Sequence, residues 1–144
     1  MFRFSKKMMY AVEAVVDIAR HAAAGPVQSK SLAQRHDIPE RYLEQVMQRL
    51  VRSNILQGVR GPRGGYLLGR DQSAITVGDI VSVVRDVDSS GESAAGQIPG
   101  GVTADYLRPQ LAELDTYLME RLAKITLEEL VDHAVPSSVA ANVA

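Results

Sequence analysis

The sequence predicts a mainly α-helical chain with one small β-hairpin. Three observations support this fold class. Apolar residues recur at helical spacing in several stretches, two short apolar runs flank a glycine-rich turn, and leucines recur every three or four residues after position 106. From these patterns we expect a domain over residues 1–86, a flexible loop over 87–102, a long helix with a short terminal helix over 103–135, and a frayed tail over 136–144.

The first two helices are indicated by the residues at their ends. Ser5 can cap the start of a helix, and the Gly-Pro pair at 25–26 prevents that helix from continuing. A second, short helix is expected to begin at Ser29 or Ser31 and to end near His36. Ser31 has a glutamine three residues later, which is the spacing of a capping box.

A third helix and a hairpin follow directly. Pro39 suits the first turn of a helix over 39–53, because its missing N–H would be unpaired there anyway. The inward face of this helix is expected to carry Tyr42, Leu43, Val46, Met47 and Leu50. Residues 55–59 and 65–68 are predicted to be strands, and residues 60–64 form the turn that joins them.

The fourth helix is predicted from its capping box and is followed by a segment of different composition. Thr76 and Asp79 have capping-box spacing and precede an apolar run that continues to Val84. From Asp88 to Gly101, half of the 14 positions are glycine or serine, and only Ile98 is a large aliphatic residue. Such a segment buries little apolar surface, so we expect a mobile loop.

The last long helix carries a continuous apolar face. Its members recur at spacings of three and four residues, and they are Leu107, Leu111, Leu114, Leu118, Leu122 and Ile125. One helix outside the N-terminal domain cannot cover this whole face within its own chain, so we expect a homodimer. The alternative is that the helix packs back on the first helix. Thr126 and Glu129 then have the spacing of a capping box that begins a short terminal helix.

Charge is distributed unevenly although the formal net charge is only −1. Residues 1–86 contain 13 Lys and Arg against 8 Asp and Glu, a balance of +5. Residues 87–144 contain 3 against 9, a balance of −6. The positive charge is therefore concentrated in the half that holds the short helices and the hairpin, as a protein that binds phosphates requires.

The composition excludes several kinds of site. The chain has no cysteine, so it cannot itself form disulfides, thiolate-held zinc or thiolate-held iron–sulfur clusters, and its three histidines are far apart in the sequence. We therefore expect no metal site, no cofactor and no enzymatic activity. No apolar run is long enough to cross a membrane and no signal peptide is evident, so we expect a cytoplasmic protein.

The helix pair and the hairpin together predict a winged helix-turn-helix, in which the second helix of the pair lies in the DNA major groove. Near its start, Arg41 can donate to guanine, Gln45 can pair with adenine and Glu44 can accept from cytosine. A carboxylate facing DNA lowers affinity, so Glu44 indicates discrimination between bases. Arg60 and Arg63 in the hairpin turn are suited to a narrow minor groove.

Other residues are expected to contact the DNA backbone and to set the register without reading sequence. They are Arg3, Lys6, Lys7, Tyr10, Lys30, Tyr42, Gln48, Arg49, Gly64 and Gly65. His36 is expected to form a local hydrogen bond. A plain solvated helix face would be the better explanation of the polar residues of helix 39–53 if the hairpin did not follow it. The glycine-rich turn lacks the Gly-Lys-Ser/Thr sequence of a nucleotide-binding loop.

Two other function classes compete with double-stranded DNA binding. One is a winged-helix module that binds a protein partner and does not read DNA, against which the charge division argues. The other is a small enzyme, for which no catalytic set can be argued from the spacing.

These residues resemble the Rrf2 family of bacterial transcription regulators. The resemblance rests on Tyr42-Leu-Glu-Gln45, on residues 59–68 with the sequence VRGPRGGYLL, on Ser31-Leu-Ala33 and on Thr76-Val-Gly-Asp-Ile80. It extends from about Phe2 to the segment 126–131. The resemblance implies a homodimeric repressor with a long C-terminal dimerisation helix and a pseudo-palindromic operator. It also assigns base reading to Glu44, Gln45 and Arg60.

One feature departs from the family pattern. Many members hold an iron–sulfur cluster through three cysteines in the loop that corresponds here to residues 88–97, which contains none. Either this member works without a cluster, or cysteines of the natural protein have been replaced by Ser or Ala. Some relatives without a cluster respond to a partner protein, so a regulatory protein or a small-molecule effector is the expected source of the signal.

Overall fold

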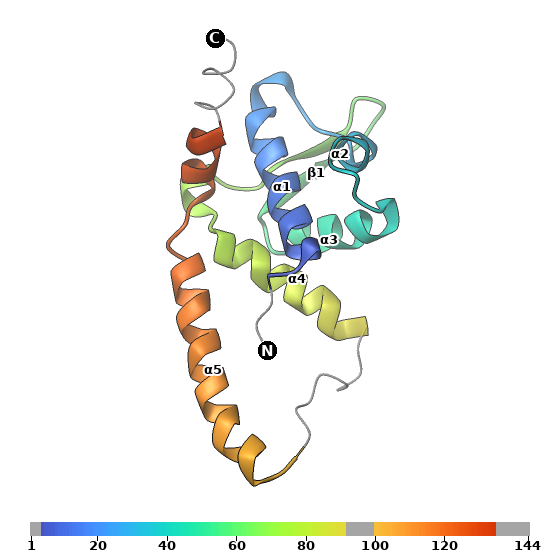
Figure 1. Cartoon of the computed structure of the whole chain (residues 1–144). Helices are drawn as coiled ribbons and strands as arrows, with labels where there is room; N and C mark the ends of the chain where they lie inside the picture. Colours follow the sequence, from blue (N-terminus) through green and yellow to red (C-terminus); the bar gives the residue numbers. More distant parts are fainter. Residues whose placement is uncertain (1–3, 92–99, 135–144) are drawn as a thin grey trace, which may run out of the picture.

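The computed structural model describes residues 4–91 and 100–134 and confirms the predicted fold class. Five named helices and one two-stranded sheet follow one another along the described chain (Figure 1). They are α1 (Lys6–Arg20), α2 (Ser29–His36), α3 (Glu40–Arg52), β1 (Leu56–Val59), β2 (Gly65–Leu68), α4 (Val77–Gly91) and α5 (Val102–Leu122). Short 3-10 turns occur at η1 (Ala22–Ala24) and η2 (Gln72–Ala74), and residues 127–134 are also helical.

The core lies where α1, α2, α3 and α4 meet. Each helix contributes fully buried aliphatic or sulfur-containing side chains, among them Val15, Ile18, Leu32, Leu43, Met47 and Ile80. Burying one such side chain contributes about 1.5–3 kcal/mol. This core holds the two helices of the helix-turn-helix at a fixed angle to each other.

Two predicted caps are confirmed. Ser5 Oγ accepts a hydrogen bond of 3.3 Å from the Met8 N–H at the start of α1. At the start of α4, the Thr76 N–H donates to Asp79 Oδ2 at 3.0 Å, and the Asp79 N–H donates to Thr76 Oγ1 at 3.1 Å. Both helices therefore begin where a side chain satisfies otherwise unpaired N–H groups.

The predicted start of α2 at Ser29 is confirmed, and the alternative, Ser31, lies inside the helix and does not cap it. The predicted start of α3 needs correction. Pro39 has φ −56° and ψ 122° and is the residue before α3, so the helix begins at Glu40. The φ of proline suits this position equally well, because the carbonyl oxygen of Pro39 accepts the first hydrogen bond of the helix, from the Leu43 N–H.

Strands β1 and β2 pair antiparallel, with Leu56 opposite Leu68 and Val59 opposite Gly65. A single bridge between Val27 and Tyr66 adds the segment before α2 to the edge of β2. Gly65 has a φ of +151°, and a Cβ there would lie 2.5 Å from the Val27 carbonyl oxygen. Glycine therefore permits the close approach that attaches the hairpin to the rest of the domain.

The predicted loop begins later than expected. Helix α4 continues to Gly91, so residues 88–91 are helical, while residues 92–99 lie outside the described residues. Extending an existing helix by one turn is much easier than starting a new one, so weak helix formers such as serine can still be included. An ion pair of 3.5 Å between Lys7 and Asp88 also holds this last turn.

The start of helix α5 lies away from the N-terminal domain, and the helix runs toward the domain, so that its end lies beside it (Figure 1). The predicted apolar face is divided accordingly. Leu107 and Leu114 are exposed, whereas Leu111, Leu118 and Leu122 are half-buried. Leu122 packs against the core, so part of the face is covered within the chain, although the helix that α5 contacts is α4 and not the first helix of the alternative.

The prediction that Ile125 belongs to the long helix is wrong, because this residue lies three positions beyond the end of α5. Its carbonyl oxygen accepts a hydrogen bond of 2.9 Å from Val77, and the N–H of the buried Leu127 donates to Ile75 at 2.8 Å. Thr126 caps the following helical residues, since its Oγ1 accepts from the Glu129 N–H at 3.2 Å. The residues after α5 are therefore attached to the N-terminal domain.

Candidate nucleic-acid interface

Helix α3 exposes the side chains that the sequence predicts for base reading. Arg41, Glu44 and Gln45 are all exposed, and so is Gln48 one turn later. Arg49 is half-buried, and the opposite side of the helix is buried in the core. The helix therefore has one polar face free along its length, as a helix that enters a major groove must have.

A buried carboxylate connects α1 to the end of α2. Asp17 of α1 is only 7% exposed and accepts hydrogen bonds from Arg35 Nε at 3.0 Å and from Arg35 Nη2 at 2.6 Å. His36 Nε2 donates to Asp17 Oδ2 at 2.7 Å, and His21 Nδ1 lies 2.9 Å from Oδ1. The local hydrogen bond predicted for His36 is therefore confirmed, and its partner is the residue that connects α1 to the end of α2.

The charge balance around Asp17 favours its ionised form. Burial raises the pKa of the Asp17 carboxyl, but the hydrogen bonds from Arg35 and His36 outweigh burial and hold this pKa below its usual value. Asp37 follows immediately in the left-handed conformation, with φ 51° and ψ 47°, and turns the chain toward α3. The sequence reasoning missed Asp17, whose only sequence signal is a charged residue within an apolar helix face.

The wing places two arginines at its end. Arg60 and Arg63 are both exposed, and between them Gly61 has a φ of +113°. Gly64 is buried, and its N–H closes the turn by donating to the Gly61 carbonyl oxygen at 2.9 Å. The positive φ at Gly61 is one that other residues rarely adopt, so the tight turn that presents the arginines depends on glycine.

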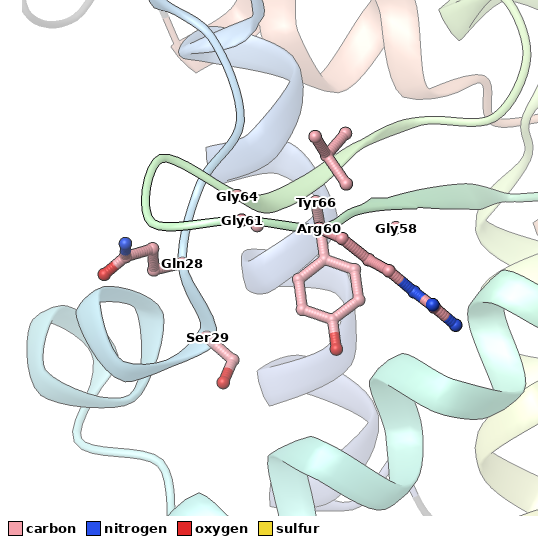
Figure 2. A pocket seen from close by; sticks show the side chains of 9 residues that line it. Gln28, Ser29, Gly58, Arg60, Gly61, Gly64 and Tyr66 are labelled. Carbon is pink, nitrogen blue, oxygen red and sulfur yellow. The ribbon is translucent and has the colours of Figure 1, made fainter.

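An open groove of about 480 Å³ lies between the wing and the start of α2 (Figure 2). Its lining consists of Gln28, Ser29, Gly58, Val59, Arg60, Gly61, Gly64, Gly65 and Tyr66. In Figure 2 the side chains of Arg60 and Tyr66 extend from the hairpin on the same side, and Ser29 lies at the start of α2. The first N–H groups of a helix have no partner within it and favour anions. Gln28 and Ser29 are thus candidate phosphate contacts that the sequence reasoning missed.

The remaining predicted backbone contacts differ in exposure. Lys6, Lys7 and Lys30 are exposed at the starts of α1 and α2, which suits contact with phosphates. Tyr10 is partly buried and packs against the core. Arg3 lies outside the described residues.

Tyr42 does not fit the predicted contact with the DNA backbone. Its hydroxyl oxygen is buried and has no hydrogen-bond partner among the described residues. Burial raises the pKa of the Tyr42 phenol, and the nearby Asp88 carboxylate raises it further. The physical reason for the difference is that position 42 lies on the inward side of α3, where the ring packs against the core.

The described residues show no grouping of His, Asp and Glu suited to a metal ion. A thiolate-held iron cluster does not fit this chain either, because its sequence contains no cysteine. Within residues 4–91 and 100–134, no helix combines the length and hydropathy that crossing a membrane would need.

Comparisons with known proteins agree with this geometry. The Rrf2 family, described as iron-dependent transcriptional regulators, matches residues 4–133. The chain is 39% identical over 132 residues to the HTH-type transcriptional regulator IscR of Escherichia coli, an alignment that covers 91% of this chain and 81% of the relative.

Two solved structures are similar over nearly the whole chain. IscR of T. potens has 33% identity and a TM-score of 0.69, covering 92% of this chain and 88% of that one. CymR, the global cysteine regulator of B. subtilis, has 31% identity and a TM-score of 0.68, covering 92% and 98%. The family match, the sequence identity and the winged helix-turn-helix agree, and the chain belongs to the Rrf2 family of DNA-binding transcriptional regulators.

Proposed function

We propose that the chain binds a pseudo-palindromic operator as a homodimer and represses transcription from a nearby promoter. The observation that carries this proposal is the exposed polar face of α3 next to a wing with two exposed arginines. In a twofold dimer, the two half-sites would be separated by about one helical turn, roughly 10 bp, or a multiple of it.

Selection from a random duplex library tests sequence-specific binding. We expect an enriched pseudo-palindrome that binds at least about a thousandfold more tightly than scrambled DNA, measured by fluorescence anisotropy at several salt concentrations. Weak binding with no enriched sequence would contradict the operator proposal. Reporter transcription from a promoter that carries the enriched site should rise when the protein is deleted, and a fall would identify an activator instead.

The roles of individual residues can be separated by comparing operator and scrambled DNA. Arg60→Ala should weaken operator binding and relax the sequence preference, with a loss of about 1–3 kcal/mol in discrimination. Lys7→Ala should weaken both DNAs alike and lower the salt slope by about one unit. Lys124→Ala is the control, because it removes one positive charge from an exposed position beyond α5. Equal losses on both DNAs for Arg60→Ala would contradict base reading.

The homodimer proposal is supported by the apolar surface of α5. Besides Leu107 and Leu114, the exposed large apolar and aromatic residues of this helix are Val102, Tyr106 and Tyr117. Tyr117 and Leu114 are each 63% exposed, which is unusual for such side chains in a surface that has no partner. A second copy of the helix would cover this surface by a self-complementary contact.

Two variants of α5 test the dimer with matched chemistry. Leu114→Glu should convert the dimer to a monomer in sedimentation experiments, because it places a charge in the centre of the proposed interface. Thr116→Glu adds the same side chain two residues later, about 200° around the helix, and should leave the dimer intact. A monomeric wild-type chain, or a dimer that tolerates Leu114→Glu, would refute this interface.

We further propose that this member regulates DNA binding without an iron–sulfur cluster, in response to a regulatory protein or a small-molecule effector. The absence of thiols from the sequence supports the proposal. Protein purified without oxygen should contain iron far below one atom per chain, and an iron chelator should not change its operator affinity. Stoichiometric iron together with chelator-sensitive binding would overturn it.

A further inference from the structure

Three helices meet around the side chain of Lys7. Its Nζ lies 3.5 Å from Asp88 Oδ1 in the last turn of α4 and 5.2 Å from the centroid of the Tyr42 ring on α3. The side chains of Lys7 and Asp88 are 56% and 32% exposed, so the pair lies at the surface. Lys7 is thus held between a carboxylate and an aromatic ring.

The position of Asp88 is unfavourable unless it has a cationic partner. The carbonyl oxygens at the end of a helix carry partial negative charge, and a carboxylate in the last turn is repelled by them. Tyr42 provides no compensating hydrogen bond, because its hydroxyl is buried without a partner among the described residues. Lys7 is the cation that the described structure places against this carboxylate.

Lys7 is also one of the phosphate contacts expected from the proposed function. The present inference rests on that proposed function. A lysine that neutralises one phosphate releases about one counterion and steepens the dependence of affinity on salt. A carboxylate 3.5 Å away offsets part of this positive charge and also repels the phosphate. Asp88 and a DNA phosphate therefore compete for Lys7.

We propose that Asp88 attenuates DNA binding by neutralising Lys7, so that the last turn of α4 lowers the affinity of the winged helix for the DNA backbone. Exposed ion pairs of this kind shift an equilibrium by about 1.4- to 5-fold. Asp88→Asn should therefore tighten binding to operator and to scrambled DNA by about 1.4- to 5-fold. The gain is the same on both DNAs, because a phosphate contact carries no sequence information.

The experiment is an anisotropy titration of the full chain with the selected operator and with scrambled DNA at several salt concentrations. The variants are Asp88→Asn, Lys7→Ala and the double variant. Glu13→Gln is the matched control, because it removes one negative charge from an exposed position on α1 itself. We expect tighter binding and a steeper salt slope for Asp88→Asn, almost no change for Glu13→Gln, and no gain from Asp88→Asn when Lys7 is already alanine.

Two results would overturn the proposal. One is a gain for Asp88→Asn that equals the gain for Glu13→Gln, which would reveal a general effect of net charge. The other is a gain that persists in the Lys7→Ala background. Failure of the proposed function looks different, since the wild-type chain itself would then show no salt-sensitive binding to either DNA. Urea unfolding of Asp88→Asn checks that the variant is folded. We expect it to be folded, because asparagine removes the unfavourable charge from the end of α4.

Discussion

Replacing Asp17 by asparagine is expected to destabilise the domain by about 2–4 kcal/mol, a figure that follows from the partners of this carboxylate. Asparagine has almost the same shape, but it offers one acceptor oxygen in place of two and carries no charge. Its NH2 group would face either Arg35 or His36, both of which donate to Asp17 in the wild-type chain.

The magnitude is set by how much of each interaction is shielded from water. A hydrogen bond to a charged group contributes about 1.5–3 kcal/mol, and we assign one such loss to the contact with His36, whose side chain is 25% exposed. Arg35 is 44% exposed, so its share is reduced to the value of a surface pair, about 0.2–1 kcal/mol. The total is a large part of the stability of a typical domain, about 5–15 kcal/mol.

Urea unfolding followed by circular dichroism measures this change, with Glu13→Gln as the control on the same helix. The control replaces an exposed carboxylate and should stay within about 0.5 kcal/mol of the wild type. If Asp17→Asn is as stable as the control, the carboxylate does not hold α1 to α2 and the reasoning is refuted.

The dependence on pH provides a second measurement. The folded-state pKa of Asp17 lies below its usual value of 3.8, so the stability it contributes is fully present above that value. This contribution is lost as the pH falls through the lower, folded-state pKa. The wild type should therefore lose stability progressively below about pH 4, and Asp17→Asn should show a smaller decline over the same range.

Three further substitutions probe the caps, the wing and the buried tyrosine, each by urea unfolding. Thr76→Ala removes the reciprocal cap of α4 and should cost about 0.5–2 kcal/mol, and an unchanged midpoint would mean that the cap is not formed in solution. Gly65→Ala places a Cβ 2.5 Å from the Val27 carbonyl oxygen and should lower the free energy of unfolding by more than about 1 kcal/mol. Gly58→Ala is the control, because a Cβ added at Gly58 has nothing within 4 Å. Tyr42→Phe removes a buried hydroxyl without a partner and should be neutral or stabilising by about 1 kcal/mol, and a clear loss would reveal an unrecognised partner.

Much of the fold could be predicted from the sequence because its signals are local. The caps at Ser5 and Thr76 depend on residues three positions apart, and the hairpin depends on a short glycine-rich turn. The exposed face of α3 follows from the spacing of its buried residues. One correction depended on a distant contact. The extension of α4 to Gly91 involves Lys7, which is 81 positions away from Asp88 in the sequence.

The candidate site shows the same division. The polar face of α3 and the two wing arginines could be predicted from periodicity and turn composition alone. Gln28 and Ser29 could not, because they reach the wing only through the bridge between Val27 and Tyr66. Asp17 was missed for a related reason, since its partner Arg35 is 18 residues away and belongs to a different helix.

The two halves of α4 are held by interactions of different strength, which bears on how α5 and the DNA-binding face are connected. In its first half Ile80, Val81 and Val84 are fully buried, and each such side chain contributes about 1.5–3 kcal/mol. In its second half Arg85 donates to Asp115 of α5 at 2.6 and 2.9 Å, and Asp88 pairs with Lys7 of α1. These are exposed or half-exposed pairs, each contributing about 0.2–1 kcal/mol.

Arg85 and Asp88 are three residues apart and therefore lie close together on the surface of α4. One carries an ion pair to the proposed dimer helix and the other an ion pair to the start of α1, where the predicted phosphate contacts lie. A small displacement of α5 relative to the core would act on the weakly held half of α4, because the buried half resists movement. The turn of α4 that holds Lys7 thus lies between the ion pair with α5 and the predicted DNA backbone contacts at the start of α1.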